Sequence, residues 1–152
     1  MAVSIETGIE IHAPLALVWG ILRDFPRYGE WNPLVVRAAG PFVPGEKIEV
    51  SVRLPGREAM AFRPTLLVLD EGRELRWRGS LAVPGLFVGE HAFIMTERGA
   101  GVLQFVHRER FRGLLVPFLS RRWFERVRQG FESMNEALKA RAEKQGIDSF
   151  RK

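Results

Sequence analysis

The chain contains no cysteine, which excludes disulfide bonds, thiolate metal ligands and cysteine nucleophiles. It has only three histidines, His12, His91 and His107, and their wide spacing does not favour a metal site. The sequence also lacks a nucleophile elbow, a phosphate-binding loop and a dinucleotide-binding loop. We therefore expect neither a metal nor a cofactor.

Long hydrophobic runs are missing as well. The most apolar stretch, from Gly113 to Leu119, has seven residues and contains Pro117, whereas a membrane-spanning helix needs about 20. The N-terminus carries Glu6 and Glu10 and no basic segment before an apolar run, so we expect no signal peptide. With 46% hydrophobic and 27% charged residues, residues 1–152 are expected to form one soluble, cytoplasmic domain.

The net charge of +5 is concentrated in one segment. From His107 to Arg128, seven arginines stand against only Glu109 and Glu125, so residues 108–128 alone carry the whole excess. Such a surface attracts an acidic partner or an anionic membrane surface, although an ordinary solvated face explains it as well. Nucleic acid is the least expected partner, because the aromatic residues here lie on the apolar face rather than among the arginines.

The hydrophobic pattern changes from strand to helix along the chain. Residues 3–11 alternate between apolar and polar, as in a half-buried strand; Pro14 then opens a short helix and Asp24 precedes a second. Further strands are predicted over residues 34–39, 46–53, 58–69, 73–81, 87–97 and 101–112. The turns between them are too short for parallel crossovers. From 117 to 143 the period becomes helical, with a frayed tail expected after Gln145.

This order of elements predicts an α+β fold. A seven-stranded, curved antiparallel sheet would wrap around a long C-terminal helix, and two short helices would follow the first strand and close one end. Whether the space between sheet and helix is a solid core or a cavity decides the function.

Six motifs carry a resemblance to a known superfamily: IEIHAP at 9–14, FPRYGEWNP at 25–33, LRWRG at 75–79, GEHAF at 89–93, ERFRGL at 109–114 and FESMNEALK at 131–139. Over residues 3–143 the chain resembles the START-like helix-grip superfamily, also called SRPBCC, and within it the polyketide cyclase/dehydrase group. The resemblance implies a helix-grip fold with a deep apolar cavity for a lipid, a polyketide or a similar molecule. It does not single out one function, because carriers, receptors and enzymes share this scaffold.

Strand alternation selects candidate site residues. Phe105, His107, Glu109 and Phe111 share one face of the last strand, opposite the arginines, and should point inward together with His91. Either His107, Glu109 and His91 satisfy one another in the core, or they orient a ligand or act as acid and base. The remaining candidate ligand contacts are Trp31, Phe62, Trp77, Phe93, Phe105, Phe111, Phe118, Trp123 and Val127.

Three functions remain open at this stage. The first is binding or transport of a small hydrophobic ligand in the cavity. The second is a cofactor-independent cyclase, dehydratase or isomerase that uses His107, Glu109 and His91. The third is an interaction protein that uses the basic surface of residues 108–128, and a homodimer is not excluded.

Overall fold

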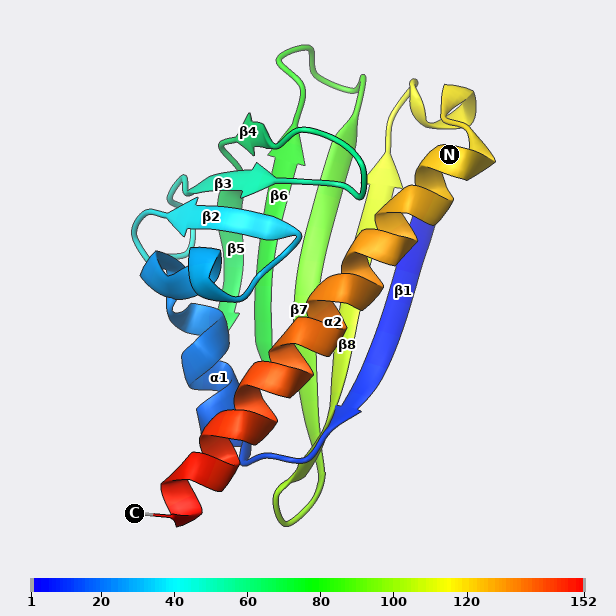
Figure 1. Ribbon diagram of the computed structural model, residues 1–152. Helices are drawn as coiled ribbons and strands as arrows, with labels where there is room; N and C mark the ends of the chain where they lie inside the picture. Colours follow the sequence, from blue (N-terminus) through cyan, green and yellow to red (C-terminus); the bar gives the residue numbers. More distant parts are fainter. Residues whose placement is uncertain (1, 152) are drawn as a thin grey trace.

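The structure is a computed structural model that describes residues 2–151 (Figure 1). Within these residues there are eight strands, two α-helices and two short 3-10 helices. In chain order the elements are β1 (Ala2–Ile11), α1 (Leu15–Arg23), η1 (Phe25–Glu30), β2 (Val35–Ala39), β3 (Glu49–Val52), β4 (Met60–Phe62), β5 (Thr65–Asp70), β6 (Glu74–Ser80), β7 (Val88–Gly99), β8 (Val102–Arg112), η2 (Val116–Phe118) and α2 (Arg121–Phe150).

The strands form two antiparallel sheets. The larger sheet has five strands in the order β1-β8-β7-β6-β5, and the smaller one has three in the order β2-β3-β4. The α+β class and the antiparallel pairing are confirmed, but the expected single seven-stranded sheet is wrong. The predicted strand 58–69 is broken at Arg63 and Pro64 into β4 and β5. Proline has no N–H to donate to a strand ladder, so the chain changes sheets at Pro64.

Helix α2 crosses the concave face of the five-stranded sheet diagonally (Figure 1). It begins at Arg121 rather than at Pro117, because the Ser120 side chain caps it by accepting a hydrogen bond from the Trp123 N–H at 3.1 Å. It continues to Phe150, so the expected fraying after Gln145 is wrong. No helix in the described part of the chain is both long and apolar enough to span a bilayer.

Side chains fill only part of the space between the sheet and α2. Near the C-terminal half of α2, the inward residues Leu75, Phe93, Leu103 and Phe105 are buried completely. Helices α1 and η1 close this end of the molecule, as the sequence predicts (Figure 1). The opposite end, beside the first turns of α2, holds the candidate site.

Candidate functional site

A cavity of about 1060 Å³ lies between the two sheets and the N-terminal half of α2. The walls are mainly apolar, whereas its polar lining residues are Ser80, Ser120, Arg57, Glu58, Arg122, Arg126, His91 and Glu109. Among these the His91 and Glu109 side chains are 8% and 19% exposed, Arg126 is half-buried, and the other five residues are exposed. The apolar walls are formed by Leu34, Val50, Val52, Leu54, Met60, Phe62, Pro64, Trp77, Leu81, Phe87, Phe111, Leu115, Leu119, Trp123, Val127 and Phe131.

Two glycines leave this part of the sheet bare. Gly79 on β6 lies directly opposite Gly89 on β7, and both line the cavity. Two residues further along the same inward faces, Trp77 and His91 pair across the strands, and both side chains are buried. Across β6 and β7 the inward face therefore changes from a pair of large rings to a pair of glycines, and the cavity begins there.

Five polar residues form one hydrogen-bonded chain beside the cavity, which we call the histidine relay. Glu109 Oε2 lies 3.4 Å from His91 Nδ1, and His91 Nε2 lies 2.8 Å from His107 Nε2. On the far side, His107 Nδ1 lies 3.0 Å from Asn135 Oδ1, and the Asn135 amide donates to the Thr7 hydroxyl at 2.8 Å. The relay thus joins strands β1, β7 and β8 to helix α2.

Aromatic rings hold both imidazoles in place. Phe131 stacks on His107 with ring centroids 3.9 Å apart and planes within 4°, and Trp77 stacks on His91 at 5.0 Å and 7°. Burial in these apolar surroundings, together with the neighbouring His91, holds the pKa of His107 well below its usual range. His107 is therefore neutral in the folded protein at neutral pH.

The hydrogen-bond partners fix where the protons lie in the relay. The backbone carbonyl of His107 can only accept, so the Thr7 hydroxyl donates to it and accepts from the Asn135 amide nitrogen. The Asn135 carbonyl then faces Nδ1 of His107, which carries that ring's proton. Nε2 of His107 accepts from Nε2–H of His91. The remaining contact joins His91 Nδ1 to Glu109 Oε2 at 3.4 Å.

Glu109 is the end of the relay that meets the cavity. Its second oxygen, Oε1, lies 2.7 Å from the position that a Cβ at residue 89 would occupy, so only glycine there leaves room for the carboxylate. Both Glu109 and Gly89 line the cavity. Because Oε2 faces His91, Oε1 is the relay atom that can exchange a proton or a hydrogen bond with a molecule inside.

The structure brings together most, but not all, of the candidate site residues. Seven line the cavity: Phe62, Trp77, His91, Glu109, Phe111, Trp123 and Val127. Phe93, Phe105 and His107 point inward as expected, but they are completely buried beneath the cavity wall. Phe118 points to solvent with 84% of its surface exposed, because η2 turns it away from the cavity.

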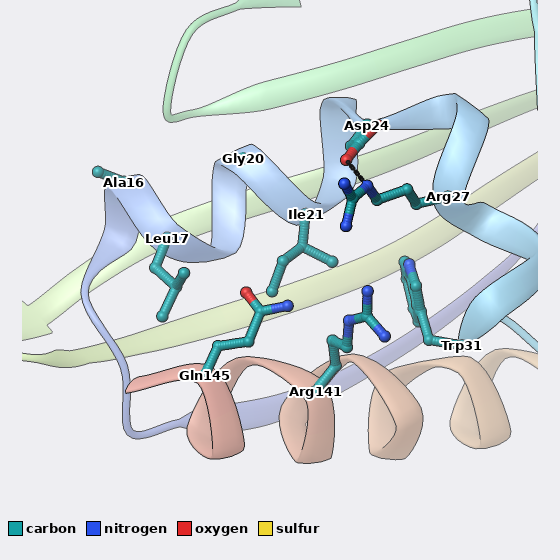
Figure 2. Close-up of a pocket in the computed structure, with 9 residues that line it drawn as sticks. All are labelled: Ala16, Leu17, Gly20, Ile21, Asp24, Arg27, Trp31, Arg141 and Gln145. Atoms are coloured by element: carbon teal, nitrogen blue, oxygen red, sulfur yellow. Dashed lines mark ion pairs between the residues drawn. The ribbon is translucent and has the colours of Figure 1, made fainter. Parts of the chain in front are cut away.

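Trp31 lies at a separate pocket of about 280 Å³ between α1 and α2 (Figure 2). Trp31 is a candidate ligand contact by sequence, but η1 places it beside the C-terminal half of α2 and not at the large cavity. The charges near this pocket are already paired, with Arg27 3.4 Å from Asp24 and Arg141 2.9 Å from Glu30. Nothing in this small pocket sets it apart as a second site.

Sequence reasoning missed Asn135 and Thr7, although both leave a signal. Asn135 interrupts the apolar stripe of α2 between Phe131 and Leu138, and Thr7 falls on the apolar side of β1. A polar residue at a position that the pattern assigns to the core requires a hydrogen-bond partner. The part of the cavity wall formed by Val50 and Val52 of β3 leaves no such signal, because alternation does not reveal where one sheet ends and another begins.

The curved sheet, the long C-terminal helix and the cavity between them define a START-like, helix-grip protein. The family model described as polyketide cyclase / dehydrase and lipid transport matches residues 2–143. The chain therefore belongs to that family. No curated protein matches the chain.

Solved structures of several helix-grip proteins superpose on the chain. The Zhui aromatase/cyclase from Streptomyces sp. R1128 is 19% identical, with a TM-score of 0.75 over 95% of this chain and 96% of that one. A START superfamily protein from Mycobacterium smegmatis is 15% identical, with a TM-score of 0.74 over 93% and 98%. The major latex-like protein 151 from Panax ginseng is 11% identical, with a TM-score of 0.73 over 93% and 97%. At these identities the likeness establishes the fold alone.

Proposed function

We propose that the protein binds a small hydrophobic molecule in the cavity of about 1060 Å³. The observation that carries this proposal is the contrast between the apolar walls and the adjoining polar pair on the sheet, His91 and Glu109. Apolar pockets with a few converging polar groups are the usual form of small-molecule sites, in which the polar groups fix orientation. The family description, which includes both cyclases and lipid transport, supports a hydrophobic guest.

The same geometry defines the chemistry of the guest. Glu109 Oε1, beside the contact of Oε2 with His91, offers one hydrogen-bonding point at the inner wall. A guest with a hydroxyl group can donate a hydrogen bond to this oxygen, whereas a pure hydrocarbon would leave the oxygen without a partner as water is displaced. We therefore propose a mainly apolar molecule that carries at least one oxygen function.

Binding can be tested with N-phenyl-1-naphthylamine, a neutral fluorophore that the arginines at the cavity edge do not attract. A side chain at Gly79 would project into the cavity, so Gly79→Phe is expected to weaken binding at least tenfold. Gly99→Phe is the matched control, because Gly99 is exposed at the far end of β7 with nothing within 4 Å of a Cβ there. Equal affinities of the two variants would contradict the proposed site.

The relay favours a second candidate function, acid–base conversion of the bound molecule. An acid–base step would use the Glu109–His91 contact beside the cavity: the pair would donate a proton to a ligand oxygen and take one back from an adjacent carbon, as enolisation or dehydration requires. Glu109→Gln keeps the shape but cannot exchange the proton. Conversion of a polyketide-like substrate by the wild type, lost in Glu109→Gln while binding persists, would establish an enzyme; binding without conversion by the wild type identifies a carrier.

A further inference from the structure

Exposed hydrophobic side chains gather at one end of the molecule. Of the nine large exposed hydrophobic residues in the described chain, six belong to three segments beside the cavity: Met60, Phe62, Leu81, Val83, Leu114 and Phe118. We call this the mouth surface. It comprises β4, the β6–β7 loop and the turn around η2, which lie together at the upper end of the view in Figure 1. Phe118 and Leu114 are 84% and 74% exposed.

Backbone contacts fix two of these segments against each other. The Leu114 N–H donates to the Gly85 carbonyl at 3.1 Å, and the Leu115 N–H donates to the Leu86 carbonyl at 3.0 Å. Gly113 makes this approach feasible, because it has φ of +126° and a Cβ there would lie 2.5 Å from the Leu86 carbonyl oxygen. These backbone contacts therefore hold the apolar side chains in an exposed position. Their exposure to water is unfavourable, and a partner that covers them would remove this cost.

Positive charge surrounds the same end. Segments 57–62, 81–87 and 112–126 contain five arginines, Arg57, Arg112, Arg121, Arg122 and Arg126, against two acids, Glu58 and Glu125. Within residues 2–151 none of these five guanidinium groups forms an ion pair with a carboxylate, whereas Arg108 on the outer face of β8 pairs with Glu6. Of the seven arginines in the basic segment only Arg108 forms an ion pair within residues 2–151, and four of the other six, Arg112, Arg121, Arg122 and Arg126, fall in the segment 112–126 at this end.

We propose that the mouth surface docks on a membrane that contains anionic lipids. Apolar side chains enter the boundary between headgroups and acyl chains, while the unpaired arginines meet the lipid phosphates. Met60, Phe62 and Leu81 also line the cavity, so the apolar surface is continuous with its interior. The role of the docking rests on the proposed function: it would allow a hydrophobic guest to pass between the bilayer and the cavity without crossing water.

Flotation with vesicles tests the docking. The full-length protein is mixed with vesicles of phosphatidylcholine, either pure or containing phosphatidylglycerol, over a range of NaCl concentrations. We expect binding to the anionic vesicles that exceeds binding to the neutral ones and weakens as salt rises. Absence of binding to anionic vesicles at low salt would overturn the proposal.

Two pairs of matched variants locate the contact. Leu114→Ser with Phe118→Ser should weaken vesicle binding about tenfold or more, since each removes an apolar side chain from the contact. Ile147→Ser with Phe150→Ser, which alters exposed residues at the far end of α2, should not change it. Arg112→Gln with Arg121→Gln should lower binding, and Arg98→Gln with Arg151→Gln should not. Equal losses in test and control variants would overturn the proposal.

The readouts separate this inference from the proposed function. Leu114, Phe118, Arg112 and Arg121 do not line the cavity, so binding of N-phenyl-1-naphthylamine should be unchanged in these variants. If the wild type binds the fluorophore but not anionic vesicles, only the proposal of membrane docking is overturned. If it binds anionic vesicles but not the fluorophore, only the proposed binding of a ligand in the cavity is overturned. If light scattering shows a dimer that Phe118→Ser dissociates, while no vesicles bind, the mouth surface joins two copies of this chain instead.

Discussion

Replacing Gly79 with phenylalanine provides a stability test of the hollow interior. The glycine lies on the inward face of β6 and lines the cavity, and an ideal Cβ there meets only Pro64 Cβ, at 3.8 Å. Replacing a glycine within a strand by a residue with a side chain stabilises the folded protein by about 0.5–1 kcal/mol. A phenyl ring that is buried by half against the cavity wall adds about 1 kcal/mol, given about 1.5–3 kcal/mol for full burial.

We therefore expect Gly79→Phe to stabilise the ligand-free protein by about 1–2 kcal/mol. If side chains instead filled this volume, the same ring would be forced into a packed core and would destabilise the fold by about 1–3 kcal/mol. The sign of the change thus distinguishes a cavity from a solid core. Urea denaturation measures it, with Gly99→Phe as the control for the strand effect alone. A lower unfolding midpoint for Gly79→Phe than for the wild type would refute the reasoning.

Three further predictions concern the histidine relay. Asn135→Ala leaves the His107 Nδ1–H without its buried acceptor and should cost about 1–3 kcal/mol in urea denaturation; an unchanged midpoint would speak against the relay. Because the folded pKa of His107 is lowered, only the unfolded chain gains a proton there as pH falls below about 6.5, so the free energy of unfolding should drop by up to about 1.4 kcal/mol per pH unit. His107→Asn should remove this dependence of the free energy of unfolding on pH. If the variant and the wild type lose stability in parallel as the pH falls, the dependence does not come from His107. Gly89→Ala should displace the Glu109 carboxylate and change the ¹⁵N shifts of His91, which Gly99→Ala should leave unaltered.

Much of the inward face could be predicted because period-two alternation is a local property. It placed His107 with Phe105 and Phe111 on the buried side of β8, opposite the arginines, and the structure agrees. The same reasoning placed Glu109 and His91 inward, and their contact across β7 and β8 follows from direct pairing of the two residues in the ladder. Local pattern alone could not show which of these side chains reach the cavity.

The division into two sheets was harder to predict. Residues 58–69 read as one strand by composition, and Pro64 was the only sign of a break. As a result, Val50 and Val52 of β3 form a part of the cavity wall that sequence reasoning did not foresee, whereas Phe62 of β4 was among the candidates. The position of Trp31 was missed for a related reason: the direction in which η1 leaves α1 depends on tertiary packing, which adjacent residues do not encode.

Methyl NMR of the uniformly ¹³C-labelled protein during titration with N-phenyl-1-naphthylamine is the most direct check on whether a guest occupies this space. Saturable shifts are predicted for Leu34, Val50 and Val127, which line the cavity, with little change for Leu103 and Leu138 in the filled half of the fold. No saturable shifts, or shifts confined to surface methyl groups, would contradict the existence of an accessible binding cavity.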